Sequence, residues 1–179
     1  MLFRSDAYEL LKGRDIRHLA VTEQGKVVGV LAHSDLMRAV GMMDLLRKKH
    51  ASDNMLSSVA RVGPTDSLSD VISSMIERMV SSVIVTSDRK PLGIISERDI
   101  PLVVQKYIDT SMVSAAEVMT SPVCTVNLTA SAHEASESLR QNKVRQLVVT
   151  DQHGHPTGIT TQASLLSAFD PQDVTHMSN

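Results

Sequence analysis

The sequence predicts an α/β protein built from a repeated β-α-β-β-α unit. Three segments, Leu19–Leu36, Val83–Ile100 and Leu147–Leu165, align with a glycine in register, and these glycines are 64 and 65 residues apart. Short aliphatic runs typical of strands alternate with stretches whose apolar residues recur at helical spacing. An internal period of this kind indicates that one small unit was copied, so we expect function to lie between the copies.

The second unit shows the pattern most clearly. Val59–Val62 predicts a short strand before a Gly-Pro turn. A helix follows, with an apolar face made of Leu68, Val71, Ile72, Met75, Ile76 and Met79. Ser67 and Asp70 resemble a helix-opening capping box. Two further strands, Val83–Val85 and Leu92–Ile95, are joined by a polar turn.

A second helix is expected to open near Ser96. If Ser96 is the N-cap, Pro101 falls inside the helix and removes a backbone hydrogen bond. A helix start nearer Asp99 would avoid that loss.

The third unit follows the same plan, with strands and helices predicted at Val123–Val126, Ser131–Gln141, Leu147–Val149, Thr157–Thr160 and Thr161–Ala168. The first unit is shorter. Its segment Asp6–Leu11 aligns with Asp70–Met75, so its first strand would precede Met1. We therefore expect either a fragment of a longer protein or a unit that borrows a strand.

These alignments divide the chain into a partial unit with a linker helix at 1–50, complete units at 51–110 and 111–170, and a tail at 171–179. The linker helix carries an apolar stripe of Leu36, Ala39, Val40, Met43 and Leu46. Such a stripe is more typical of core or dimer packing than of a cofactor site.

The composition of the 179 residues limits the classes of function. Aromatic residues are few and tryptophan is absent, so an aliphatic core is expected. The net charge of −2 offers no dominant basic field for nucleic acid or an acidic membrane. No apolar run is long enough to span a membrane. The single cysteine, Cys124, excludes an intrachain disulfide and fits a reducing, cytoplasmic location.

The segment Val83–Asp99 resembles the signature of the cystathionine-beta-synthase (CBS) domain family, in which an apolar strand and a hairpin precede Gly-apolar-apolar-Thr/Ser-x-x-Asp. Glu117–Val126 is similar to the usual opening of the family, and Ile16–Val21 and Val144–Val149 are similar to its second strand. The likeness extends over essentially the whole chain. It implies tandem units paired through their sheets, which commonly bind adenosine-containing ligands and regulate an attached enzyme, channel or transporter.

The resemblance assigns ribose and phosphate contacts to Ser96 and Asp99. A carboxylate in the first turn of a helix can accept both ribose hydroxyls, and free N–H groups there suit a phosphate. The same Ser-x-x-Asp pattern is also a helix cap, and the two functions can coexist. The other candidate ligand residues are Arg98 and Arg145 for phosphate, Val59 and Val83 for adenine, and Thr161 and Asp35 from the neighbouring units.

The three units are not equivalent at the motif. The first keeps Asp35 but has Ala32 in place of the hydroxyl residue. The third keeps Thr161 but has Ser164 in place of the carboxylate, which leaves a ribose site there in doubt. The second unit alone has the complete set.

The sequence gives little indication of a metal site or of a catalytic site. His153 and His155 lie in a predicted turn without a third metal ligand nearby, so solvated turn residues are the simpler interpretation. Cys124 lacks a catalytic pattern around it and is better explained as a small strand side chain. We therefore expect neither an enzyme nor a metal protein.

The sequence thus predicts a regulatory, cytoplasmic, homodimeric module that senses an adenosine-type small molecule such as AMP, ADP, ATP or S-adenosylmethionine. Two alternatives remain open. One is a ligand-free dimerisation scaffold, and the other is a regulatory fragment of a larger enzyme.

Overall fold

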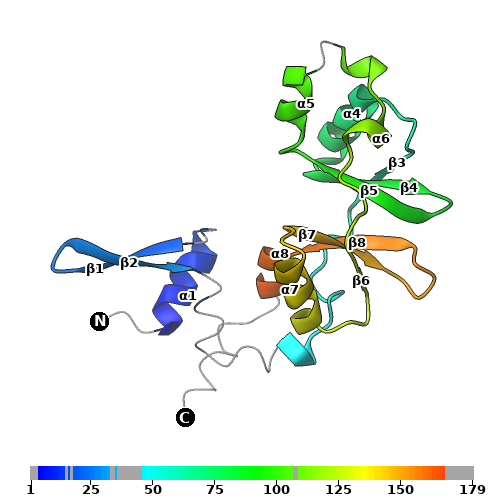
Figure 1. The fold of residues 1–179 in the computed structure, drawn as a ribbon. Helices are drawn as coiled ribbons and strands as arrows, with labels where there is room; N and C mark the ends of the chain where they lie inside the picture. The colour runs from blue at the N-terminus through cyan, green and yellow to red at the C-terminus, as the bar shows by residue number, and fades with distance from the viewer. Residues whose placement is uncertain are drawn as a thin grey trace.

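The computed structural model describes residues 4–14, 16, 18–32, 35, 46–106 and 109–167. The chain is of the α/β class and contains three successive units, as predicted (Figure 1). The first unit comprises α1 (Arg4–Gly13), β1 (His18–Glu23) and β2 (Lys26–Ala32). The second comprises β3 (Ala60–Val62), α4 (Leu68–Arg78), β4 (Ser82–Ser87), β5 (Lys90–Ser96) and α5 (Ile100–Lys106). A connection with η1 (Thr110–Met112) and α6 (Ala115–Val118) leads to β6 (Thr125–Asn127), α7 (Ala132–Gln141), β7 (Gln146–Thr150), β8 (Pro156–Thr161) and α8 (Gln162–Ser167).

The second and third units have the same three-stranded sheet. In each, the first strand runs parallel to the second, and the second pairs antiparallel with the third. The hairpins of all three units also share one register, with a bulge at the same place. The pairs Ala20–Val30, Ile84–Ile94 and Val148–Ile159 therefore occupy equivalent positions.

Local sequence signals set the helix starts. The Asp70 amide donates to the Ser67 hydroxyl at 3.1 Å, which confirms the predicted cap of α4. Ser131 and Glu134 form a full capping box at the start of α7. Helix α5 begins at Ile100, so Pro101 lies in the first turn, where its missing N–H is not needed.

Buried aliphatic side chains on the two faces of each sheet build the paired module. One face packs against the unit's own helices, and in the second unit Val83, Val85 and Ile95 meet α4 there. The opposite faces of the two sheets pack against each other through a cluster of Ile84, Ile94, Val148 and Ile159, bordered by Val59 and Val123. Figure 1 shows the two sheets stacked, with helices on the outer side of each.

Two crossing segments, residues 49–59 before β3 and 113–123 before β6, join the units reciprocally. Leu56 pairs with Ile159 through backbone hydrogen bonds of 2.8 and 3.0 Å. Thr120 pairs in the same way with Ile94, at 2.9 and 3.1 Å. The segment that leads into the second unit therefore pairs with β8, the last strand of the third unit. The segment that leads into the third unit pairs with β5, the last strand of the second unit.

The crossing segments explain two glycines. A Cβ atom on Gly93 would lie 2.5 Å from Sδ and 2.9 Å from Cβ of Met119, and one on Gly158 would lie 2.7 Å from Sδ of Met55. The equivalent Gly29 of the first unit has no atom within 4 Å of such a position.

Among the described residues the first unit has only the two strands of its hairpin. The expected apolar stripe at 36–46 lies outside the described residues except for Leu46, which is buried.

We predict that Gly93→Ala destabilises the chain and that Gly29→Ala does not. The new methyl group at position 93 meets the Cβ of Met119, which cannot move without its backbone, so the free energy of unfolding should fall by about 1–3 kcal/mol. Thermal and urea unfolding of the two variants measure the difference. Equal losses at both positions would contradict this account of the glycine.

We also predict that Ser131→Ala lowers the stability of α7 by about 1 kcal/mol, because it removes the N-cap side chain. The backbone amide and hydroxyl of Ser131 donate to Glu134 and lower the pKa of its carboxyl. A lowered pKa means that this stabilisation is present at neutral pH and is lost as the pH falls through the pKa of the folded state. The stability difference between parent and variant should therefore shrink in acid. Ser136→Ala in the middle of the same helix is the matched control and should cost nothing.

Candidate ligand site between the second and third units

A pseudo-twofold axis passes between the second and third units. The Ser82 hydroxyl donates to Oε1 of Gln146 at 2.9 Å, and these two residues occupy equivalent positions 64 residues apart. The motif residues Ser96 and Thr161, which pair with Ser82 and Gln146 across their own hairpins, are equivalent as well. The structure therefore brings the motif ends of both units to one region of the interface.

A cavity of about 480 Å³ lies on one side of this axis. We call it the apolar cavity, because no charged residue belongs to its described lining. The crossing segment, the start of β4 and the end of β8 contribute its walls, which consist of Met55, Leu56, Ser57, Ser58, Val59, Met79, Val80, Ser81, Ser82, Gln146, Ile159 and Thr161. Its volume falls in the range of small-ligand sites.

A second cavity of about 240 Å³ lies on the axis itself. We call it the arginine cavity, because Arg98 and Arg145 line it together with a single carboxylate, Glu97. The remaining walls are Ser81, Ser82, Ser96, Val144, Gln146, Thr161, Gln162 and Ala163. In side-chain charge the lining is therefore positive by one.

The two cavities are neighbours, since Ser81, Ser82, Gln146 and Thr161 line both. A molecule with an uncharged, flat part and an anionic part can therefore lie with one part in each cavity.

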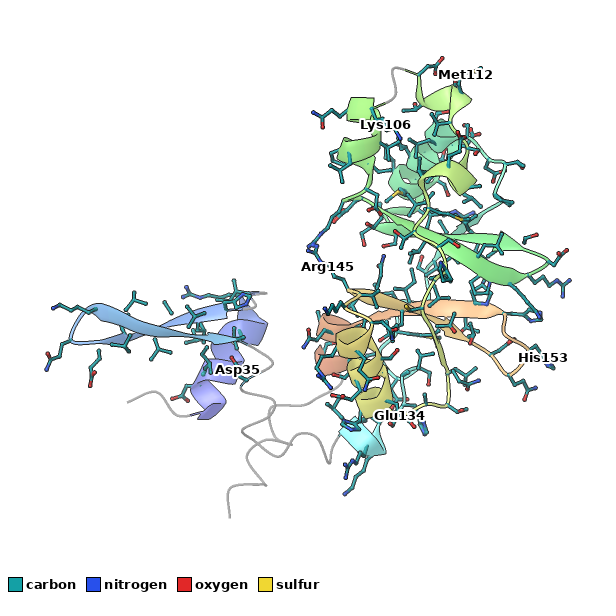
Figure 2. The ribbon with its side chains drawn as sticks, viewed as in Figure 1. Asp35, Lys106, Met112, Glu134, Arg145 and His153 are labelled. Carbon is teal, nitrogen blue, oxygen red and sulfur yellow. The ribbon has the colours of Figure 1, made fainter. Side chains whose placement is uncertain are left out.

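The two arginines are available for a ligand. Neither guanidinium has an ion-pair or hydrogen-bond partner among the described residues, and both residues are exposed. They come from different units, Arg98 after β5 and Arg145 before β7. In Figure 2 the side chain of Arg145 lies at the edge of the region where the two units meet. A guanidinium group presents two parallel N–H donors, which suits a phosphate.

Asp99 has a local structural function. Its Oδ2 atom accepts hydrogen bonds from the amide and hydroxyl of Ser96, at 2.8 and 2.7 Å. These bonds close a turn over residues 96–99, and helix α5 begins only after it, at Ile100, so Ser96 is not the N-cap of that helix. The other carboxylate oxygen has no partner among the described residues, and Asp99 lines neither of the two cavities.

The same turn recurs in the other units. The Ala32 amide donates to Asp35 at 3.1 Å, and the Thr161 amide donates to the Ser164 hydroxyl at 2.9 Å. Ser164 therefore replaces the carboxylate in the turn, although it has fewer acceptor positions for a ribose. Asp35 lies in the first unit, away from both cavities (Figure 2).

The remaining predicted site residues divide into two groups. Val59 lines the apolar cavity and Thr161 lines both cavities. Val83 lines neither, because strand alternation turns its side chain to the helix side of the sheet, where it is fully buried. We therefore leave Val83 out of the proposed site.

Sequence reasoning missed the contribution of the crossing segment before β3. Met55, Leu56, Ser57 and Ser58 line the apolar cavity although no motif marks them. The available signal was the 64-residue spacing, which aligns Met55 with Met119 in the family-like opening segment.

The histidines of the β7–β8 turn contact only near neighbours in the sequence among the bonds that the structure shows. Asp151 accepts from the amides of His153 and His155, and these bonds, with the nearby His155 ring, lower the pKa of its carboxyl. Within the described ranges, no group of three or more His, Cys, Asp or Glu residues could hold a metal ion. No helix in the described part of the chain is long and apolar enough to cross a membrane.

Comparison with known proteins agrees with this architecture. The CBS domain model matches residues 4–41, 51–103 and 115–170. An uncharacterized protein of Methanopyrus kandleri, MK0525, is 28% identical over 132 residues, which are 73% of this chain and 63% of that protein. The chain therefore spans less than two thirds of the length of this relative.

Three solved structures show the same fold. The CBS-pair protein CBSX2 of Arabidopsis thaliana matches with a TM-score of 0.59 and 23% identity, over 72% of this chain and 97% of that chain. CBSX2 in complex with AMP matches with a TM-score of 0.54 and 23% identity, over 67% and 95%. Protein MJ1225 of Methanocaldococcus jannaschii, a proposed archaeal homologue of γ-AMPK, matches with a TM-score of 0.67 and 20% identity, over 92% and 63%. With the family model matching most of the sequence across all three units, the chain belongs to the CBS domain family.

Proposed function

We propose that the chain is a regulatory module that binds an adenosine-containing nucleotide between its second and third CBS units. The observation that carries this proposal is the continuity of the apolar cavity with the arginine cavity through four shared residues. A nucleotide has the same division into a flat, uncharged base and an anionic phosphate.

The adenosine part is assigned to the apolar cavity. Val59 and Ile159 offer aliphatic surfaces for a base, and the serine hydroxyls and the Thr161 hydroxyl offer hydrogen bonds to its edge and to the ribose. The phosphates are assigned to the arginine cavity, where Arg98 and Arg145 exceed the single carboxylate of Glu97. The AMP complex of CBSX2 supports an adenosine ligand for a protein of this fold.

Asp99 remains a candidate ligand residue by the family resemblance, in addition to its function in closing the turn with Ser96. One of its oxygens is held by Ser96, which orients the other, and that oxygen is free to accept a ribose hydroxyl. The two functions use different atoms, so they are compatible.

The proposed mechanism is a shift between arrangements of the two units. Arg98 and Arg145 belong to different units, so a phosphate that binds both is bound more tightly when the units are closely paired. A ligand shifts such an equilibrium only by its difference in affinity for the two arrangements. The output is the effect of this shift on an attached or partner domain in a cytoplasmic signalling protein.

The alternative, a ligand-free scaffold, is favoured by the altered motif residues Ala32 and Ser164. The two proposals differ in whether a nucleotide binds. Calorimetry and thermal shift with AMP, ADP, ATP and S-adenosylmethionine test this, because a ligand that binds the folded state raises its stability. Absence of binding by all four at millimolar concentration would leave the scaffold as the better account.

We predict that Arg98→Gln and Arg145→Gln each weaken ATP binding by about tenfold or more, while adenosine binding changes little. Each variant loses a charge-assisted hydrogen bond, worth roughly 1.5–3 kcal/mol, to the phosphates alone. Arg140→Gln is the matched control, since Arg140 lies on α7 and pairs with Glu137. Equal effects on ATP and adenosine would contradict the assignment of phosphate to the arginine cavity.

We predict that Asp99→Ala weakens nucleotide binding by about tenfold, whereas Asp35→Ala leaves it unchanged. Both substitutions remove a carboxylate that caps its own turn, so the pair controls for the local loss of stability. Calorimetry gives the affinities, and unfolding curves give the cost of the cap separately. Unchanged affinity in the folded Asp99→Ala protein would confine Asp99 to closing the turn with Ser96.

A further inference from the structure

Met79 lines the apolar cavity and also faces solvent. It belongs to the described walls of the cavity, and it is 92% exposed. A side chain meets both conditions only where the cavity opens to solvent. Met79 therefore lies at the mouth of the apolar cavity.

The backbone around Met79 is held in place, although the side chain is not packed. Met79 follows α4 in the left-handed region, with a φ of 51°. Its amide donates to the carbonyl of Ile76 at 3.1 Å, and the Val80 amide donates to the carbonyl of Met75 at 3.0 Å. Val80 in turn packs against the core of the second unit. The Cα–Cβ bond of Met79 therefore has a fixed direction, and only the torsions of its flexible side chain remain free.

The left-handed position after a helix usually holds glycine, because a side chain there crowds the backbone. This chain has a side chain at that position in two units, and the equivalent of Met79 in the third unit is Lys143, with a φ of 53°. Lys143 lines neither of the two cavities. An uncommon backbone conformation beside a candidate site is a reason to look for a function. Here it keeps a thioether at the mouth of the apolar cavity.

We propose that Met79 covers the base in the apolar cavity and is a modification site, where oxidation of the thioether weakens nucleotide binding. This inference rests on the proposed function. A thioether is apolar and polarizable and makes favourable contacts with aromatic rings. Val59 and Ile159 line the same cavity, so Met79 adds an apolar contact at the open side of the base.

Oxidation by a hydroperoxide removes the apolar character of this contact. With hydrogen peroxide, the Sδ atom attacks one peroxide oxygen, the S–O bond forms, and the O–O bond breaks. The sulfur is oxidised by two electrons, and the proton of the transferred oxygen moves to the leaving oxygen, which departs as water. The product is a polar sulfoxide. The face of a base offers it no hydrogen-bond donor, so covering the base with it costs free energy.

The exposure of the methionines predicts which of them react first. Among the described methionines, Met75 is buried, and Met55 and Met119 are partly buried. Met112 is 81% exposed, which is comparable to Met79, but it lines neither cavity. In Figure 2 Met112 lies at the end of the second unit that is far from the contact between the two sheets. Met112 is therefore a matched control for oxidation without an effect on the site.

Mild oxidation of the full chain with hydrogen peroxide tests the proposal, with peptide mapping by mass spectrometry and calorimetry with AMP as the measurements. Met79 and Met112 should be oxidised before Met75, and the affinity for AMP should fall by about tenfold. Whatever affinity Met79→Leu has before oxidation, it should keep afterwards, because leucine has no thioether. Oxidised Met112→Leu should lose affinity as the oxidised parent does. Methionine sulfoxide reductases should restore binding to the parent.

Protection by the nucleotide gives a second readout. AMP should slow the oxidation of Met79 and leave the oxidation of Met112 unchanged, because only Met79 is covered by the ligand. Undiminished affinity in a parent whose Met79 is fully oxidised, or an equal loss in oxidised Met79→Leu, would overturn this inference and leave the proposed function intact. Failure of the unoxidised parent to bind AMP would also overturn this inference. Failure with ADP, ATP and S-adenosylmethionine as well would overturn the proposed function too.

Discussion

The contact between two small sheets is the interaction on which the rest of the structure depends. A three-stranded sheet has two apolar faces, and the helices of one unit cover only one of them. The second face is covered when Ile84 and Ile94 meet Val148 and Ile159. Burial of such side chains is worth about 1.5–3 kcal/mol each, so the pair of units is far more stable than two separate ones. The cavities that could hold a ligand exist because the sheets meet here.

The crossing segments fix the position of one sheet relative to the other in this contact. Each supplies a backbone pairing to the last strand of the opposite unit and a methionine that lies on that strand's glycine. Leu56 and Thr120 therefore fix how far one sheet can slide along the other. The segment before β3 also forms a wall of the apolar cavity, so the geometry of the cavity depends on its pairing with β8.

Much of the fold was predictable from the chain because local signals repeat. The 64-residue spacing shows the copies. Within one unit, near neighbours in the sequence form the helical stripe from Leu68 to Met79 and the cap at Ser67.

The residues of the candidate site were predictable only in part. Arg98, Arg145 and Thr161 line one cavity at the unit ends, but the fully buried Val83 does not. Met55 and Ser57 reach the cavity because their segment crosses to the other unit, and pattern within one unit carries no information about such a crossing.

The reciprocal crossing has a consequence for what counts as a domain. A cut near residue 110 would follow the period of the sequence, but it would take from the second unit the strand neighbour Thr120 and the methionine that lies on Gly93. The repeat that is visible in the sequence is therefore shorter than the segment that completes one folded unit. The second and third units should therefore open and close as one cooperative block in hydrogen exchange.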